Sequence, residues 1–134
     1  QGAIKGQRLS LMLQDLTRPA AAINDFDKLP RQFRAVAADI GTGEEIVLRS
    51  GSLSLAMRAS MSVPAAFPPV EIDGRTLVDG GIVNNVPVSV ARSLGADIII
   101  VSGFEAQTKR PEELTSAVAI LNQSIDLMMA RSTR

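Results

Sequence analysis

The chain has 134 residues, of which 46% are hydrophobic and 21% charged, a composition typical of one globular unit. Its 14 Lys and Arg residues balance its 14 Asp and Glu residues, so no basic field favours nucleic acid or an anionic membrane surface. The absence of Cys and His excludes disulfides, thiolate metal ligands, the usual zinc sites and a Ser-His-Asp relay. A G-x-x-x-x-G-K loop and a dinucleotide fingerprint are also absent, so we expect no cofactor, and we assign no metal-ligating residues.

The first part of the chain predicts a helix followed by a β-hairpin. Apolar residues recur at helical spacing after Gly6, and Pro19 ends this helix. We interpret the helix as a packing element, with a lid over a site as the alternative. Residues 33–39 and 45–49 predict two strands joined through Gly41-Thr42-Gly43.

The middle of the chain predicts a second helix and a second hairpin. Residues 52–62 carry an apolar helical stripe, and Val63-Pro64 ends it. Asp73-Gly74 is a strong hairpin signal between two short strands at 70–72 and 75–78. We therefore interpret Asp73 as a turn residue.

The last third of the chain predicts a helix, a buried strand and a long final helix. Asn84 and Asn85 before Pro87 suit the start of a helix that Gly95 ends. Residues 98–101 form a continuous β-branched run, which predicts a strand buried on both faces of a parallel sheet. This strand-helix-strand order indicates an α/β architecture.

The final helix is predicted to begin at Pro111. It carries one apolar face, which we interpret as core or subunit interface and which consists of Leu114, Val118, Leu121, Ile125 and Met128.

Asp79 is the candidate catalytic residue, because an apolar strand delivers its carboxylate directly into Gly80-Gly81. Two glycines allow a sharp turn and the close approach of a neighbouring segment. Without His, proton transfer falls to a carboxylate, a Lys or a backbone group. The competing interpretation is a plain turn, since Asp-Gly pairs mark tight turns in many proteins. Asp39 is a second carboxylate, and such a pair would also allow glycoside hydrolysis, although aromatic residues that stack on sugars are scarce.

Five parts of the chain carry a recognisable family pattern. They are residues 33–39, 42–43, 58–70, 79–87 and 94–97. Together they cover about half of the chain, and they resemble the carboxyl-terminal half of the patatin-like phospholipase domain, especially in its bacterial members. The resemblance implies a three-layer α/β/α sheet, of which residues 1–134 would form the carboxyl-terminal portion of one catalytic domain.

The resemblance implies that the parent protein hydrolyses phospholipids or other fatty-acyl esters with a Ser-Asp dyad. Asp79 falls on the family's Asp-Gly-Gly/Ala position, and the residues expected to shape and hold its loop are Gly80, Gly81, Asn84 and Asn85. Met61 and Phe67 are candidates for the wall of an acyl-chain pocket, with a rigid buried crossover as the alternative interpretation.

The family's Gly-x-Ser-x-Gly nucleophile turn does not occur in this sequence, nor does the glycine-rich loop that would form an oxyanion hole. We expect both in a missing amino-terminal half of the same domain, so the isolated chain is expected to be an inactive fragment. The alternative is a non-catalytic pseudoenzyme or interaction fragment, whose final helix pairs with a partner or with a second copy. No apolar run reaches the roughly 18 residues of a membrane span, and the compartment stays open between the cytoplasm and secretion.

Overall fold

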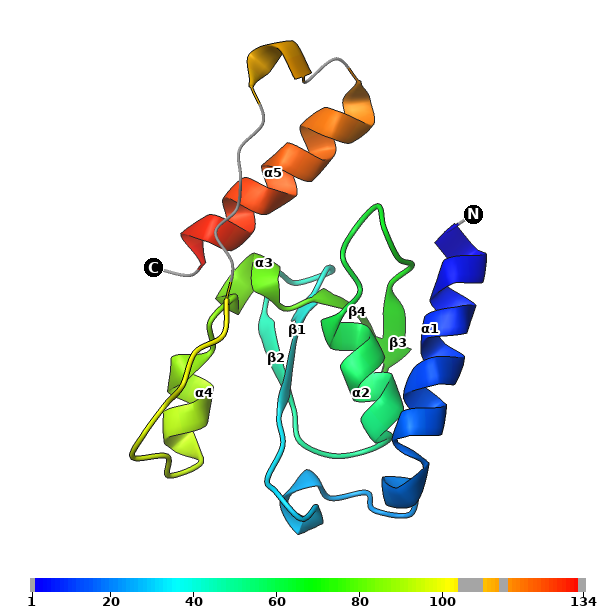
Figure 1. Ribbon diagram of the computed structural model, residues 1–134, viewed down its shortest axis with the longest axis vertical. Coiled ribbons are helices and arrows are strands. Elements are labelled where there is room, and N and C mark those ends of the chain that lie inside the picture. Colours follow the sequence, from blue (N-terminus) through cyan, green and yellow to red (C-terminus); the bar gives the residue numbers. More distant parts are fainter. Residues whose placement is uncertain (1, 104–109, 114–115, 133–134) are drawn as a thin grey trace.

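The computed structural model describes residues 2–103, 110–113 and 116–132, which form a four-stranded sheet flanked by helices (Figure 1). The strands are β1 Ala35–Asp39, β2 Glu45–Leu48, β3 Val70–Ile72 and β4 Arg75–Asp79. Their order in the sheet is β2-β1-β4-β3, and each neighbouring pair is antiparallel. Ala37 in the central strand β1 lies opposite Asp79, the last residue of β4.

Both predicted hairpins are confirmed. The turn between β1 and β2 is closed by a hydrogen bond from the Gly43 N–H to the Asp39 carbonyl at 2.7 Å. Between β3 and β4, Asp73 and Gly74 have φ values of 50° and 75°. Two successive positive φ values define the type I′ turn, whose twist matches that of the flanking strands.

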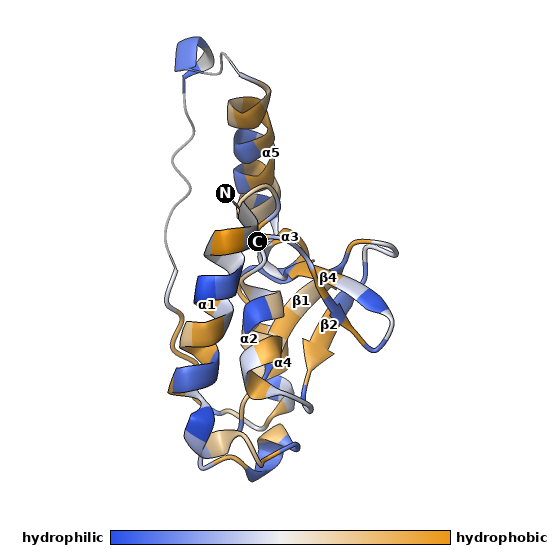
Figure 2. Ribbon diagram, turned by 90° about the vertical axis from the view of Figure 1, so that its right-hand side faces the viewer, coloured by the Kyte–Doolittle hydropathy of each residue, from blue (hydrophilic) through white to orange (hydrophobic). Residues whose placement is uncertain are grey.

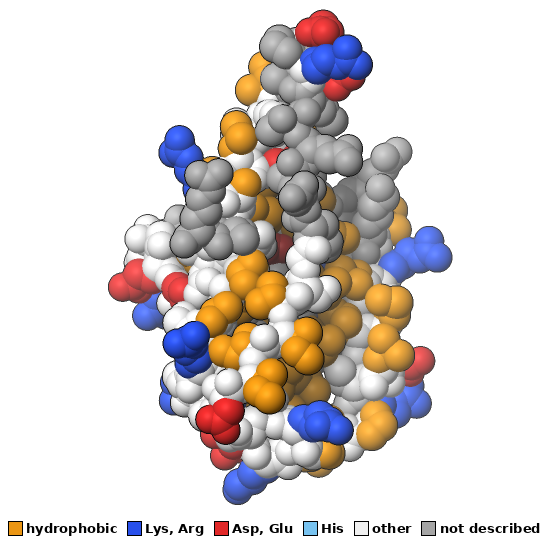
Figure 3. All heavy atoms as spheres, turned by 60° about the vertical axis from the view of Figure 1, so that its left-hand side comes forward, with side chains coloured by type: hydrophobic (Ala, Val, Ile, Leu, Met, Phe, Trp, Pro, Cys, Tyr) orange, Lys and Arg blue, Asp and Glu red, His pale blue; other side chains and the backbone are white. Residues whose placement is uncertain are grey.

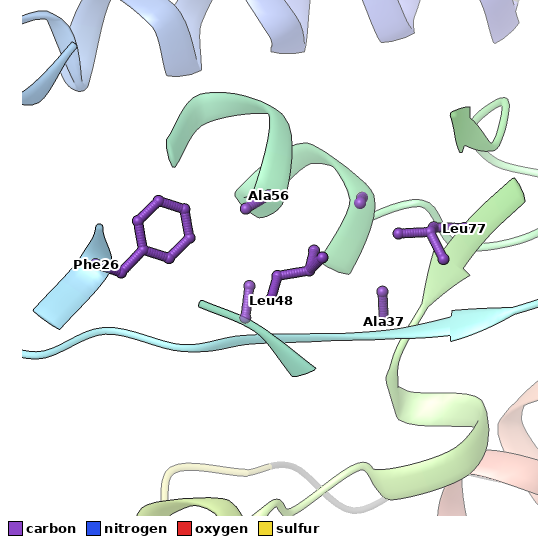
Figure 4. Packing of buried hydrophobic residues seen from close by; sticks show 7 residues of the cluster. Phe26, Ala37, Leu48, Ala56 and Leu77 are labelled. Carbon is purple, nitrogen blue, oxygen red and sulfur yellow. The ribbon is translucent and has the colours of Figure 1, made fainter. Parts of the chain in front are cut away.

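The helices lie on both sides of the sheet. They are α1 Gly2–Leu16, α2 Leu53–Ser60, α3 Gly81–Asn84, α4 Val88–Ser93 and α5 Ala117–Arg131. Helix α2 packs on β1 and β4, α1 packs on α2, and α3 contacts β1 from the other side (Figure 4). This arrangement of helices around a sheet confirms the α/β class.

Short 3₁₀ turns connect several of these elements. They are Arg18–Ala20, Phe26–Lys28 and Pro111–Glu113. Helix α1 ends at Leu16, ahead of Pro19 as predicted, although it begins before Gly6.

The core lies between α2 and the sheet (Figure 4). Phe26 and Leu77 are fully buried there, and each large apolar side chain removed from water contributes roughly 1.5–3 kcal/mol. Ala37 and Ala59 are also fully buried, and their small side chains allow the helix to approach the strand closely. The ring of Phe33 meets that of Phe26 edge to face, with centroids 5.8 Å apart.

The predicted buried strand at residues 98–101 is wrong. The segment has no strand structure, and Ile98 and Ile100 are 85% and 93% exposed. A buried parallel strand needs a hydrogen-bonded neighbour on each side. The sheet of the described residues ends at β2 and β3, and none of its strands pairs with this segment. Figure 3 shows apolar side chains gathered on the face of the molecule that carries α4 and the segment after it.

The predicted start of the final helix is also wrong. The 3₁₀ turn Pro111–Glu113 is separate from α5, which begins at Ala117 after its N-cap Ser116. The Ser116 hydroxyl accepts a hydrogen bond from the Ala119 N–H at 3.1 Å, and such a cap starts a helix where it stands. Of the predicted apolar face, Ile125 is buried, Leu114 lies outside the described residues, and three members are largely exposed: Val118, Leu121 and Met128.

Helix α5 contacts α3 and extends from it away from the sheet, with apolar and polar residues mixed along its length (Figure 2). Within the described ranges, no helix is both long and apolar enough to cross a membrane.

Asn84 and Asn85 do not cap the following helix. Asn84 ends α3 and Asn85 is its C-cap, whereas α4 begins at Val88 with Pro87 as an N-cap that makes no side-chain hydrogen bond. The reason is that the residues after Asp79 form a helical turn of their own, which places both asparagines at its carboxyl end. Gly95 ends α4 as predicted, with φ of 87°.

Candidate active site at the end of β4

Asp79 lies where the sheet ends and a short helical turn begins. Leu77 and Val78, the two preceding residues of β4, are buried and fix the strand in the core. The Asp79 N–H donates to the Ser62 carbonyl at 3.0 Å, which ties the end of β4 to the chain just after α2. The backbone of the candidate catalytic residue is thus held by the sheet on one side and by the segment after α2 on the other.

The Asp79 carboxylate is half-buried and makes a hydrogen bond within its own turn. Its Oδ1 accepts from the Gly81 N–H at 2.7 Å. Burial raises the pKa of Asp79 and the Gly81 hydrogen bond lowers it, and the net effect is a pKa above the ordinary Asp value. A carboxylate whose pKa lies closer to neutral pH is a stronger general base.

A side chain at either position after Asp79 would meet close neighbours, which are backbone atoms at Gly80 and the ends of side chains at Gly81. A Cβ at Gly80 would stand 2.2 Å from the Val36 carbonyl oxygen. A Cβ at Gly81 would stand 2.8 Å from Oδ1 of Asn85 and 3.0 Å from Oδ1 of Asp79. The close approach that the sequence predicts is therefore present. The glycine-specific backbone conformation that the sequence also suggests is absent at Gly80, because its φ of −69° is one that any residue can adopt.

A cavity of about 330 Å³ lies beside Asp79. It is bounded by α2, by the start of β1 and by the turn after β4, and its wall includes Met57, Met61 and Val36. Its lining also includes Arg34, and such a mixture of apolar walls and a few charged or polar groups is typical of small-molecule sites.

The two candidates for the acyl pocket fall in different places. Met61 lines the cavity that contains Asp79. Phe67 is not part of that wall, and its ring lies under the guanidinium of Arg58, 5.0 Å from the ring centroid. Met57, one helical turn before Met61, is a wall residue that sequence reasoning placed only on a packing stripe, although the i, i+4 spacing puts both on one side of α2.

The two asparagines line the same cavity and hold the turn. The Asn84 side-chain amide donates to Glu45 Oε2 at 3.0 Å, which links α3 to β2. The Asn85 backbone N–H donates to the Ser132 hydroxyl at 3.1 Å, which links α3 to α5. Sequence reasoning missed Ser132, because no local motif connects a serine near the end of the chain to a turn that precedes it by about fifty residues.

Asp39 is placed away from this cavity and has a different environment. Its Oδ1 accepts from the Gly41 N–H at 2.9 Å, and its Oδ2 accepts from Arg75 Nη1 at 3.0 Å. The Gly41 hydrogen bond, followed by the one from Arg75, outweighs burial and lowers the pKa of Asp39. Asp39 does not line the Asp79 cavity, and its contacts are those of a carboxylate that stabilises the turn between β1 and β2.

No group of three or more acidic side chains in the described part of the chain is placed to hold a metal ion. What the site does offer is one half-buried carboxylate. Its Oδ1 is held by the backbone, and its Oδ2 has no hydrogen bond from a described residue. This arrangement can accept a proton from a group in the cavity.

Comparison with known proteins places these residues in a family. The family model described as patatin-like phospholipase matches residues 3–92. An NTE family protein of Mycobacterium tuberculosis is 32% identical over 98% of this chain and 35% of its own length. A second protein of that family from the same organism is 50% identical over 48% of this chain and 11% of its own length. The mouse patatin-like phospholipase domain-containing protein 7 is 34% identical over 67% of this chain and 8% of its own length. The chain therefore spans about a third of the first relative and much less of the others.

Proposed function

The chain belongs to the patatin-like phospholipase family, and from this premise we propose that it contributes the general base, Asp79, to a lipid acyl-ester hydrolase with a Ser-Asp dyad. One observation carries the proposal: a half-buried carboxylate with a raised pKa stands in an Asp-Gly-Gly turn at the edge of a largely apolar cavity. A structural turn alone needs neither the cavity nor the raised pKa.

We place the nucleophilic serine outside these 134 residues, in the amino-terminal half of the same domain. No serine of this sequence stands in a Gly-x-Ser-x-Gly turn. In the proposed reaction the serine oxygen attacks the acyl carbonyl while Asp79 Oδ2 accepts the serine proton. The proton then passes to the leaving alcohol as the ester bond breaks. Asp79 next takes a proton from water, whose oxygen attacks the acyl-enzyme. The bond between the serine oxygen and the acyl group then breaks, the fatty acid is released, and Asp79 returns the proton to the serine oxygen.

The cavity wall supports the proposed substrate class. Met57 and Met61 present flexible, apolar side chains to the space beside Asp79, which suits a fatty-acyl chain of a phospholipid or another acyl ester. We therefore assign Met61 and Met57 to the wall of the acyl-chain pocket. Phe67 is not assigned to it, because Phe67 does not line the cavity.

A non-catalytic role is the second candidate, and the exposure of α5 favours it. Val118, Leu121 and Met128 expose between 47% and 63% of their surface, so the helix offers an apolar face to a partner or to a second copy of the chain. This role requires no base at Asp79.

The deciding experiment replaces Asp79 in the natural protein that contains this chain. Asp79→Asn keeps the size of the side chain but removes the proton acceptor. We expect kcat on a soluble p-nitrophenyl ester to fall by about two to four orders of magnitude, as for a positioned general base. Asp73→Asn is the control, since the type I′ turn accepts Asn as readily as Asp.

A folded Asp79→Asn variant that turns over at the parental rate would leave the non-catalytic role as the better description. The isolated chain is a second check, because without the nucleophile we expect no hydrolysis above background. Labelling of a serine within these 134 residues by a fluorophosphonate, with loss of turnover, would place the nucleophile here and contradict the proposed dyad.

A further inference from the structure

Ser132 bridges the two ends of the single helical turn α3. Its hydroxyl oxygen accepts from the Asn85 N–H at 3.1 Å and donates to the Gly81 carbonyl at 2.5 Å. In an α-helix the carbonyl of residue i and the N–H of residue i+4 face each other, and Gly81 and Asn85 are such a pair. A hydroxyl carries one proton, and the alternative acceptor, the Met129 carbonyl in the serine's own helix, is farther away at 3.0 Å.

Gly81 connects this hydroxyl to the candidate base. Its carbonyl accepts from Ser132, and its N–H donates to Asp79 Oδ1 at 2.7 Å. The two groups lie on either side of the Gly81 Cα, so a fixed carbonyl restricts how far the neighbouring N–H, which binds the carboxylate, can move. The orientation of the hydrogen bond from the Gly81 N–H to Asp79 therefore depends on the turn that Ser132 holds.

The packing of α5 on α3 keeps the hydroxyl in place. Met129 lies one turn before Ser132, and its terminal Cε methyl would be 3.2 Å from a Cβ at Gly81. The absence of a side chain at Gly81 thus lets α5 approach the backbone of the turn. Helix α5 has only one buried residue, Ile125, among those whose burial is described. Its carboxyl end is nevertheless fixed to the turn that carries the site.

From this geometry we propose that Ser132 is a positioning residue, which holds the Gly81 peptide groups and through them the carboxylate of Asp79. The proposal rests on the proposed function of Asp79, and it goes beyond it by making α5 part of the support of the site. Ser132 does not touch the reacting atoms. It stabilises the orientation in which Oδ1 accepts from the Gly81 N–H while the Asp79 side chain lines the cavity.

The test uses three variants of the natural protein that contains this chain. Ser132→Ala removes the hydroxyl, Ser132→Thr keeps one, and Ser124→Ala removes a hydroxyl that only bonds to the Ile120 carbonyl within α5. The measurements are kcat, KM and the pH profile of kcat on a soluble ester, together with hydrogen exchange of the Asn85 amide.

We expect Ser132→Ala to lower kcat about fivefold to tenfold, the factor that loss of one hydrogen bond produces. KM should change little, because the cavity wall is intact. The acid limb of the pH profile should move to higher pH, since a weaker bond from Gly81 lowers the pKa of Asp79 less. The Asn85 amide should exchange faster. Ser132→Thr should stay within about twofold of the parent in every measurement, and Ser124→Ala should match the parent.

Parental kcat and parental exchange in Ser132→Ala would overturn the proposal, and so would an equal loss in Ser124→Ala. If Ser132→Ala does not fold, the Thr variant decides: retained kcat and amide protection support the hydroxyl's role, and their loss in a folded protein contradicts it. Failure of the proposed function is recognised separately, by an active Asp79→Asn variant, because amide exchange at Asn85 reports on Ser132 whether or not Asp79 is the base.

Discussion

Gly80 lies against the central strand of the sheet, so that a Cβ at this position would stand 2.2 Å from the carbonyl oxygen of Val36. Val36 is buried in β1 and paired with Val47 of β2, and its carbonyl also accepts from the Ser60 hydroxyl at 2.7 Å. The oxygen cannot withdraw without breaking these contacts. Gly80 therefore sets the distance between the Asp79 turn and the sheet.

Gly80→Ala should destabilise the protein and displace the Asp79 turn. The overlap is with backbone in a buried strand, so we expect a loss of about 3 kcal/mol, at the upper end of the usual cost of overpacking. The measurement is the free energy of unfolding in urea, with kcat on the folded fraction. Gly103→Ala is the matched control, since a Cβ there meets nothing within 4 Å. Equal stability of the two variants would show that the turn can move away from β1.

The pH dependence of activity should report the raised pKa of Asp79. A base must be deprotonated to act, so activity should rise as pH increases through this pKa, which lies above the value of about 4 for a free Asp. Because burial is the cause of the raised pKa, salt should move the acid limb of the pH profile little. The measurement is kcat/KM against pH at two ionic strengths. An acid limb of the pH profile at the pKa of a free Asp, or a limb that salt shifts strongly, would count against a buried base.

Met61→Ala should alter chain-length preference. The side chain lines the cavity beside Asp79, and its removal should lower kcat/KM for long-chain esters about tenfold while short esters lose little. Met12→Ala is the control, since Met12 is about half exposed on α1 and does not line this cavity. The measurement is kcat/KM over a series of p-nitrophenyl esters. Phe67→Ala should leave the chain-length profile unchanged, and a shift in that variant would return Phe67 to the acyl pocket.

Asp39→Asn should affect stability and leave catalysis nearly unchanged. The folded pKa of Asp39 is lowered by Gly41 and Arg75, so its contribution to stability is present above the unfolded pKa and is lost as pH falls through the folded pKa. The variant should therefore melt at a lower temperature than the parent at pH 7, and the difference should shrink in acid. The check is thermal unfolding at several pH values, with kcat at pH 7. A large loss of kcat in folded protein would assign Asp39 a role in the reaction.

The local features of this fold could be read from the sequence. Asp73-Gly74 and Gly41-Thr42-Gly43 form the predicted hairpins, and Pro19 and Gly95 follow the helices they were expected to end. These signals depend on residues adjacent in the chain, because a turn or a helix end is decided by the φ values and hydrogen bonds of a few neighbours. The place of Asp79 at a strand end before two glycines is of the same kind.

Only the tertiary structure decided which apolar residues are covered and what each polar side chain meets. Residues 98–101 predict a buried strand, yet Ile98 and Ile100 are largely exposed. The apolar face of α5, interpreted as core or subunit interface, has Ile125 buried and three other described members about half exposed or more. Burial depends on a partner segment that composition does not specify. Contacts with residues distant in sequence also give Asp39 and Asp79 different surroundings, and they place Met61 but not Phe67 in the cavity wall. The contact of Ser132 with Gly81 is of the same kind. The sequence by itself determined the candidate base and its turn. The packing of α2 and β1 against that turn determined the cavity and the burial that raises the pKa of Asp79, and the contact of Ser132 brings the end of α5 to the same turn, because all of these come from the space and contacts that distant segments create together.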